Sequence, residues 1–199
     1  MKYNDLTWGQ MEAVVNKLGG MDGVKKFLSG ALIVVEAAVE KILEFVGIVA
    51  VDATNKFIAG EHFVIDTSAS AKVKIGFIGE SFERWFLDKT EERNIYVGLR
   101  YHQLKKNSLD KLIMDELGNT VETTLSQIWE LLKLQPWRED GVLLTNGYAN
   151  IFYVRDARGV LRAVNVRWYG NDGVWYVYAH SVEYPGRWNA GDRIFSRNS

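Results

Sequence analysis

The stretch YANIFYVRDARGVLRAVNVRWYGNDGVWYVYAHSV, residues 148–182, decides what can be said of the fold. Apolar and polar residues alternate along it, the period-two pattern of half-buried β-strands. Two clusters of turn-forming residues, 156–159 and 170–173, interrupt the alternation. We therefore expect strands at 148–155, 160–169 and 174–182, joined into an antiparallel β-meander.

Loop length fixes how these strands pair. Gly159, the last residue of the first loop, suits a three-residue hairpin loop with a type I turn and a bulge. In the second loop, two or four residues bring the apolar sides together, whereas three residues would turn every side chain to the other face. The favoured register opposes Val164 to Ala179, Val166 to Val177 and Trp168 to Trp175.

The same register collects tyrosines and polar side chains on the opposite face. Aromatic planes with hydrogen-bond donors and a fixed charge are typical of sheets that bind single-stranded nucleic acid. The competing interpretation is that a helix such as 125–132 packs on this face, where tyrosines fit well. The candidate binding residues are Asn165, Arg167, Tyr176, Tyr178 and His180.

Charge divides the chain near Asp140. Residues 141–199 hold seven Arg, no Lys and four acidic residues, whereas residues 1–140 hold 17 basic and 21 acidic ones. We therefore expect a mixed α+β region at 1–140 and the meander at 141–199, packed together as one compact unit. The fold class predicted is α+β, with helical hairpins plus an antiparallel β-meander in the C-terminal third.

Two helical hairpins are expected before the meander. Thr7 and Gln10 form a capping-box pattern that starts the first helix, and Asp22 is placed to cap a second one over 23–28. Ser108 is placed to cap a helix over 109–117, and a helix from Thr120 runs toward Pro136. Further strands are expected at 47–51, 62–66, 72–78, 95–104 and 142–145, and a further helix at 81–87.

Catalytic and metal chemistry find little support in the sequence. The chain has no cysteine, which excludes disulfides and thiolate sites and is compatible with the cytoplasm. None of His62, His102 and His180 has a partner at metal-ligand spacing. We therefore assign no catalytic, cofactor-binding or metal-ligating residue. The apolar stretch 31–51 carries too many charged residues to be expected to span a membrane. Should a general base exist, His102 is the candidate, with Glu80, Glu83 and Asp66 as acidic neighbours.

The chain resembles a family of short uncharacterised proteins from metagenome-derived genomes of uncultivated bacteria. The resemblance covers most of the chain and implies no activity, cofactor or site residue. It is carried by TWGQ (7–10), NKLGG (16–20), VETTL (121–125), LLTNG (143–147), NIFYVRD (150–156), SVE (181–183) and WNAGDRIFSR (188–197).

Three functions remain open at this stage. The leading hypothesis is a non-enzymatic binding protein that engages a nucleic acid or a protein through the meander, because that segment has a net charge of +3 and an aromatic face. The first alternative is a small hydrolase or nuclease that uses a histidine with nearby carboxylates. The second is a structural oligomer. No membrane partner is expected, and the sequence leaves the oligomeric state undetermined.

Overall fold

The computed structural model describes residues 7–34, 40–92 and 98–198, and the chain divides into two compact units, Met1–Glu40 and Lys41–Ser199. The boundary expected near Asp140 lies inside the second unit. Within the described ranges, no helix has both the length and the apolar character needed to cross a membrane.

The first unit is a pair of helices, α1 (Trp8–Lys17) and α2 (Gly20–Leu28). The expected capping box is present, because Thr7 Oγ1 accepts from the Gln10 amide and the Gln10 side chain accepts from the Thr7 amide. Asp22 does not cap α2. The helix begins earlier, after Gly19 in the left-handed conformation, so Asp22 lies in its first turn.

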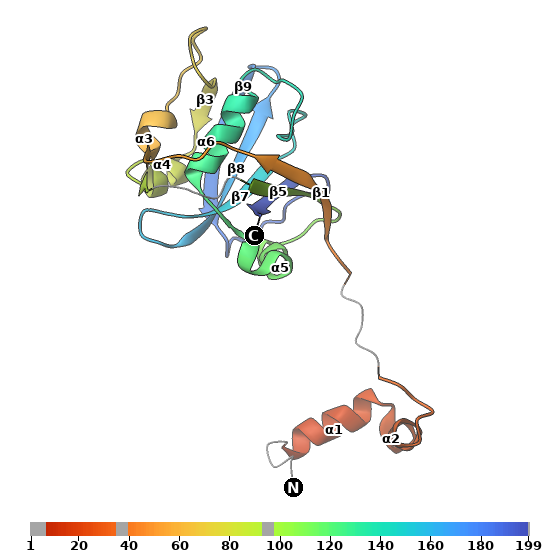
Figure 1. Cartoon of the computed structure of the whole chain (residues 1–199). Coiled ribbons are helices and arrows are strands. Elements are labelled where there is room, and N and C mark those ends of the chain that lie inside the picture. The colour runs from red at the N-terminus through yellow and green to blue at the C-terminus, as the bar shows by residue number, and fades with distance from the viewer. Residues whose placement is uncertain (1–6, 35–39, 93–97, 199) are drawn as a thin grey trace. The chain divides into compact units, whose positions relative to one another are not determined.

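A mixed sheet dominates the second unit (Figure 1). Within the described residues its strand order is β1-β5-β10-β7-β8-β9-β3, with β6 beside β7. Most neighbours are antiparallel, but β10 runs parallel to β7, β3 to β9 and β6 to β7. The strands are β1 (Leu43–Ala50), β3 (Ile75–Ile78), β5 (Gly98–Leu104), β6 (Glu122–Thr123), β7 (Asn150–Arg155), β8 (Leu161–Tyr169), β9 (Val174–Ser181) and β10 (Arg193–Arg197).

The predicted fold class, helical hairpins plus an antiparallel C-terminal meander, is therefore wrong. Strands β7, β8 and β9 do pair consecutively, but the chain then returns and places β10 between β7 and β5. The second helical hairpin is absent from the described chain, because α5 (Asp110–Leu117) and α6 (Leu125–Leu134) are separated by the 3-10 turn η1 (Gly118–Thr120) and by β6.

Several shorter predictions also fail. Residues 62–66 form no strand in the structure, since α3 (Ala59–His62) occupies the start of this segment. Residues 142–145 are likewise without a strand, and Ser108 pairs with Trp188 instead of capping α5. The expected helix at 81–87 is α4 (Glu80–Phe86), and a small separate ladder joins β2 (Phe57–Ile58) to β4 (Thr90–Glu91).

The predicted register between β8 and β9 is confirmed. A four-residue loop connects Tyr169 to Val174, and Val164, Val166 and Trp168 oppose Ala179, Val177 and Trp175. This apolar face, called the first face below, packs on α6 through Leu125, Ile128 and Leu132 in the larger hydrophobic core (Figure 1).

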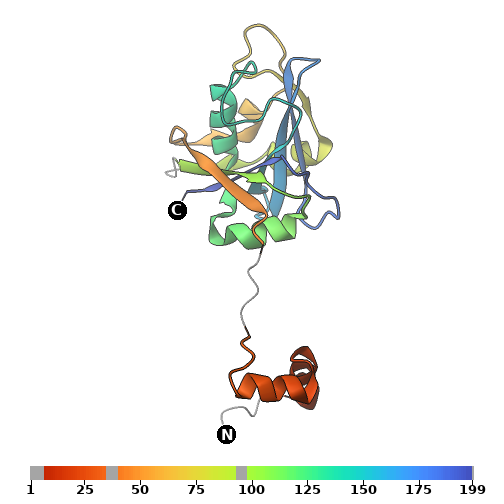
Figure 2. The ribbon, with the colours of Figure 1, turned by 90° about the vertical axis from the view of Figure 1, so that its right-hand side faces the viewer.

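The opposite face of the sheet, called the second face, is covered only in part by the described residues. Helix α5 contributes Ile113 to a smaller core with Ile151, Ala163 and Ile194. In Figure 2, α6 runs alongside the strands and α5 lies across their lower end. Leu43 of β1 and Leu104 of β5 also belong to this smaller core. The candidate sites lie at the two ends of the second face, at β9–β3 and at β1–β5.

Candidate functional site

Four aromatic rings gather at the β9–β3 end of the second face. Tyr169 and Tyr176 stack with ring centroids 4.0 Å apart, and Phe77 lies 5.4 Å from both Tyr176 and Tyr178. Phe77 is 40% exposed and Tyr169 is 39% exposed. Together with Arg167, which opposes Tyr176 across the β8–β9 ladder, these residues are called the tyrosine surface.

Hydrogen bonds fix the orientation of these rings. The Tyr176 hydroxyl donates to Asp172 Oδ2 over 2.9 Å. Burial and, second, a hydrogen bond with Tyr169 together raise the pKa of Tyr178 to about 12. These hydrogen bonds restrain the rings of Tyr176 and Tyr178.

Arg167 is the cation of this surface. Its side chain makes no ion pair or hydrogen bond with any part of the chain that the structure describes. Its positive charge nevertheless acts on its surroundings. It adds to burial in lowering the pKa of His180, and it opposes burial, which raises the pKa of Tyr178 and of Asp192. A donor without an internal partner is available to a ligand.

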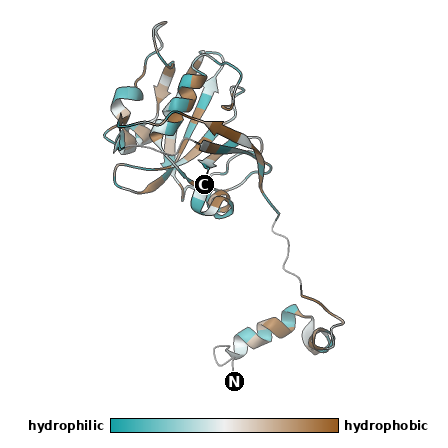
Figure 3. Cartoon of the chain, viewed as in Figure 1, coloured by the Kyte–Doolittle hydropathy of each residue, from teal (hydrophilic) through white to brown (hydrophobic). Residues whose placement is uncertain are grey.

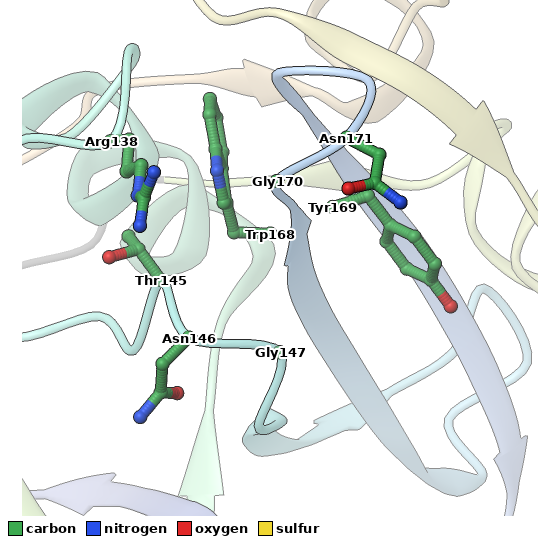
Figure 4. A pocket seen from close by; sticks show the side chains of 8 residues that line it. All are labelled: Arg138, Thr145, Asn146, Gly147, Trp168, Tyr169, Gly170 and Asn171. Atoms are coloured by element: carbon green, nitrogen blue, oxygen red, sulfur yellow. The ribbon is translucent and has the colours of Figure 1, made fainter.

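A pocket of about 390 Å³ adjoins the tyrosine surface (Figure 4). Tyr169 belongs to both, and Figure 4 shows Tyr169 and Trp168 pointing to opposite sides of β8. The indole nitrogen of Trp168 is buried and has no hydrogen-bond partner. The lining residues are Arg138, Thr145, Asn146, Gly147, Trp168, Tyr169, Gly170 and Asn171.

The structure brings three of the five predicted binding residues together. Arg167, Tyr176 and Tyr178 are partly exposed neighbours on the tyrosine surface. Asn165 shares their face, but it is only 4% exposed. His180 is also partly exposed, but its ring packs against those of Trp188, at 4.9 Å, and Tyr184, at 5.8 Å, rather than joining the tyrosine surface.

A buried carboxylate holds the covered middle of the second face. Asp110 Oδ1 accepts hydrogen bonds of 2.7 Å from both the Tyr153 hydroxyl and the Trp188 indole. Burial raises the pKa of Asp110, although the two donors oppose this effect. Burial also lowers the pKa of His180, against the nearby charge of Asp110. These contacts connect α5, β7 and the loop before β10, and they serve the packing of the face.

A second pocket, of about 430 Å³, opens at the β1–β5 end. Arg100 and His102 are two residues apart on β5, so both side chains lie on the second face. Ser196 of β10 is paired with Arg100. Glu116 of α5 accepts hydrogen bonds from the backbone amides of Ile42 and Leu43. We call this the arginine pocket; its lining residues are Lys41, Leu43, Phe45, Arg100, His102, Glu116, Leu117, Thr120 and Ser196.

His102 does not have the acidic neighbours considered from the sequence. Burial and the charge of Arg100 lower its pKa, and the carboxylate that opposes them is Glu116 rather than Glu80, Glu83 or Asp66. Across residues 7–34, 40–92 and 98–198, no three His, Asp or Glu side chains are grouped to hold a metal ion. Glu116, the carboxylate beside His102, already accepts hydrogen bonds from the backbone amides of Ile42 and Leu43.

One further member of each site could have been found by extending the alternation of side chains along the strands. Tyr169 follows Asn165 and Arg167 at the same spacing, and Arg100 precedes His102 by two residues. Phe77 could not, because a register shift between Ile75 and Phe77 turns its ring away from the buried side of β3.

Known proteins offer no further guide to these surfaces. No protein-family model, no curated protein and no solved structure matches this chain.

Proposed function

We propose that this chain is a non-enzymatic binding protein that engages a polypeptide partner through the tyrosine surface. The observation that carries the proposal is the set of four contacting rings on a part of the sheet that lies outside the two cores. Tyrosine and arginine are enriched among the residues that dominate protein interfaces.

The hydrogen bonds that restrain the rings of Tyr176 and Tyr178 support this proposal. Association costs side-chain entropy, and each ring that is already fixed reduces that cost. Tyr176 is held by Asp172, and Tyr178 by Tyr169. The adjoining pocket at Trp168 offers a partner side chain a place to insert, with an indole N–H that needs an acceptor.

Charge favours a polypeptide over a nucleic acid. Arg167 is the cation of the tyrosine surface. Tyr176, which opposes Arg167 across the ladder, donates a hydrogen bond to the carboxylate of Asp172, so the surface also carries a negative charge. A surface that binds nucleic acid tightly neutralises several phosphates. The absence of cysteine agrees with the reducing cytoplasm in which we propose that the chain acts.

Selection from a random phage-displayed peptide library tests the proposal. We expect the selected peptides to share a motif and to lose about tenfold in affinity for Tyr178→Ala, because that change opens the ring cluster. Tyr184→Ala is the matched control, since Tyr184 is 59% exposed and outside the surface. Peptides that bind Tyr178→Ala and Arg167→Ala as tightly as the wild type would overturn it.

Single-stranded nucleic acid is the second candidate partner, favoured by an arginine without an internal ion pair beside rings on which bases can stack. Fluorescence anisotropy with labelled oligo-dT and oligo-rU at low salt distinguishes the two partners. A nucleic-acid site built on one arginine predicts a log–log salt slope of about −0.7, lost in Arg167→Ala. An absence of binding at low salt excludes this candidate.

A further inference from the structure

The arginine pocket gathers buried polar atoms that have no partner in the protein. Seven buried side-chain polar atoms of the described residues lack a hydrogen-bond partner, and three of them belong to residues that line this one pocket. They are Arg100 Nε, His102 Nδ1 and Ser196 Oγ. The clustering calls for a local explanation, because unpartnered buried groups are rare in folded proteins.

The sheet register produces this juxtaposition. Arg100 and His102 are two residues apart on β5, so their side chains leave the same side of the strand. Arg100 is paired directly with Ser196 on β10, and His102 with Phe45 on β1. Three neighbouring strands thus supply the floor of the pocket, and α5 and η1 supply its side through Glu116, Leu117 and Thr120.

The His102 side chain has a hydrogen bond with the backbone of Ile194, but Arg100 Nε, His102 Nδ1 and Ser196 Oγ gain no partner from the described residues on folding. Ser196 is 0% exposed and His102 is 8% exposed. A buried polar atom that makes no hydrogen bond lowers the free energy of unfolding, because it has lost its contact with water. An apolar side chain at either position would pack without that cost. Arg100 lies 4.8 Å from the Phe45 ring and makes no ion pair within the described part of the chain. The missing hydrogen bonds are those that a ligand would supply.

We propose that the arginine pocket binds a small molecule that carries a carboxylate or phosphate group on a partly apolar body. Lys41 and Arg100 give the pocket two cations, whereas the carboxylate of Glu116 is already occupied by two backbone amides. A guanidinium whose Nε–H has no partner can donate two parallel hydrogen bonds to two oxygens of a carboxylate or phosphate group.

The remaining walls define the body of the ligand. Leu43, Phe45 and Leu117 are apolar, and a volume of about 430 Å³ exceeds what an oxyanion alone would fill. An aromatic carboxylate or an aryl phosphate fits this description. The site lies at the opposite end of the second face from the tyrosine surface, so the two proposals stand independently.

His102 adds a pH dependence to this site. The charged groups that face it are Arg100 on its own strand, Lys41 before β1 and Glu116 on α5. An anion bound beside the ring favours the imidazolium, so binding draws a proton onto His102. We expect benzoate to bind more tightly at pH 6 than at pH 8, and His102→Gln to remove most of that difference.

Calorimetric titration of the full chain with phenyl phosphate, benzoate, inorganic phosphate and phenol tests the site. We expect saturable binding of phenyl phosphate, of benzoate or of both, and no binding of phenol. Comparing phenyl phosphate with benzoate shows whether the pocket prefers a phosphate or a carboxylate group. Arg100→Gln should weaken binding by about tenfold. Ser196→Ala should weaken binding less than Arg100→Gln and should not lower the melting temperature. If Arg100→Gln does not fold, the affinity of Ser196→Ala tests the proposed site.

The matched control is Arg187→Gln, because Arg187 is exposed and lies outside the pocket. It should leave the affinity for phenyl phosphate unchanged. Equal binding of phenol, no saturable binding of any anion at millimolar concentration, or affinities unaffected by both Arg100→Gln and Ser196→Ala would each overturn the proposal.

Discussion

Asp110 and Ser196 are both buried polar residues on the second face, but they differ in what satisfies them. Asp110 Oδ1 receives two donors from within the chain, from Tyr153 and Trp188, whereas its Oδ2 receives none among the described residues. Ser196 Oγ receives none among the described residues. A buried group with internal donors belongs to the architecture, whereas one without them is better explained by a ligand. We therefore read the first as structural and the second as functional.

The structural role of Asp110 predicts a stability loss for Tyr153→Phe. This change keeps the ring, which is 0% exposed, and removes the hydroxyl that donates to the buried carboxylate. We expect the free energy of unfolding to fall by about 1.5–3 kcal/mol, because the bond is to a charged group. Urea denaturation measures it, with Tyr184→Phe as an exposed control. A loss no larger than that of the control would show that Trp188 alone satisfies Asp110.

At the scale of elements, the β7–β8 hairpin depends on Asp156. Its Oδ1 accepts from the amides of Arg158 and Val160, and its Oδ2 accepts from Arg162. Asp156→Ala leaves these donors without their partner, and we expect a loss of about 1–3 kcal/mol in the free energy of unfolding. Asp156→Asn, which keeps one acceptor oxygen, should lose less. Equal losses in the two variants would contradict this account.

The same residue gives the hairpin a dependence on pH. Burial raises the pKa of Asp156, but its hydrogen bonds with Val160, Arg162 and Arg158 outweigh burial and hold the pKa below the ordinary 3.8. A lowered pKa stabilises the fold above the ordinary value, and this contribution disappears as pH falls through the folded pKa. The stability difference between wild type and Asp156→Ala should therefore shrink below pH 3.8. A difference that is constant with pH would show that the charge is not involved.

Strand β1 ends the sheet and exposes apolar side chains along its length (Figure 3). Phe45 is 50% exposed, Val46 44% and Ile48 55%. An apolar end strand favours pairing with a second copy, and a lysine there opposes it. We expect wild type to associate at high concentration in sedimentation velocity and Val46→Lys to do so less. Val160→Lys, at a position 46% exposed but away from β1, is the control. A wild type that stays monomeric would exclude pairing through β1.

Local pattern was enough to predict the β8–β9 register, because loop length and alternation act over a few residues. It could not predict the position of β10, because Ile194 has two neighbours, His102 and Ile151, that lie far away in the sequence. It also missed β6, since two residues pairing with Tyr153 and Val154 leave no periodic signal. The polar half of the second face was predictable, but its covering by Trp188 and α5 was not.

At the scale of the whole molecule, the chain separates at Glu40 into two compact units. The two cores of the second unit contain no described residue before Ile42. In α1, none of the ten described residues is buried, and Trp8 is 86% exposed. The second unit therefore has a core of its own, whereas the described residues of the first unit, 7–34 and 40, contribute none to either core.

This division predicts that a chain starting at Lys41 folds. We expect its melting temperature to match that of the full chain, because both cores are retained. The isolated segment 1–40 should show little helix by circular dichroism, since short helices without a core are marginal in water. A large drop in the melting temperature of the truncated chain would contradict this expectation.

The position of β10 has a consequence for how the chain is made. This strand follows every other described strand in the chain, yet it lies in the middle of the sheet, where it pairs with β5 on one side and β7 on the other. Until it leaves the ribosome, β1–β5 and β7–β8–β9 are two fragments, each with an unpaired edge that can attract other chains. Assembly of this sheet therefore waits until β10 has left the ribosome, and a premature stop before Arg193 would leave two fragments that this strand can no longer join.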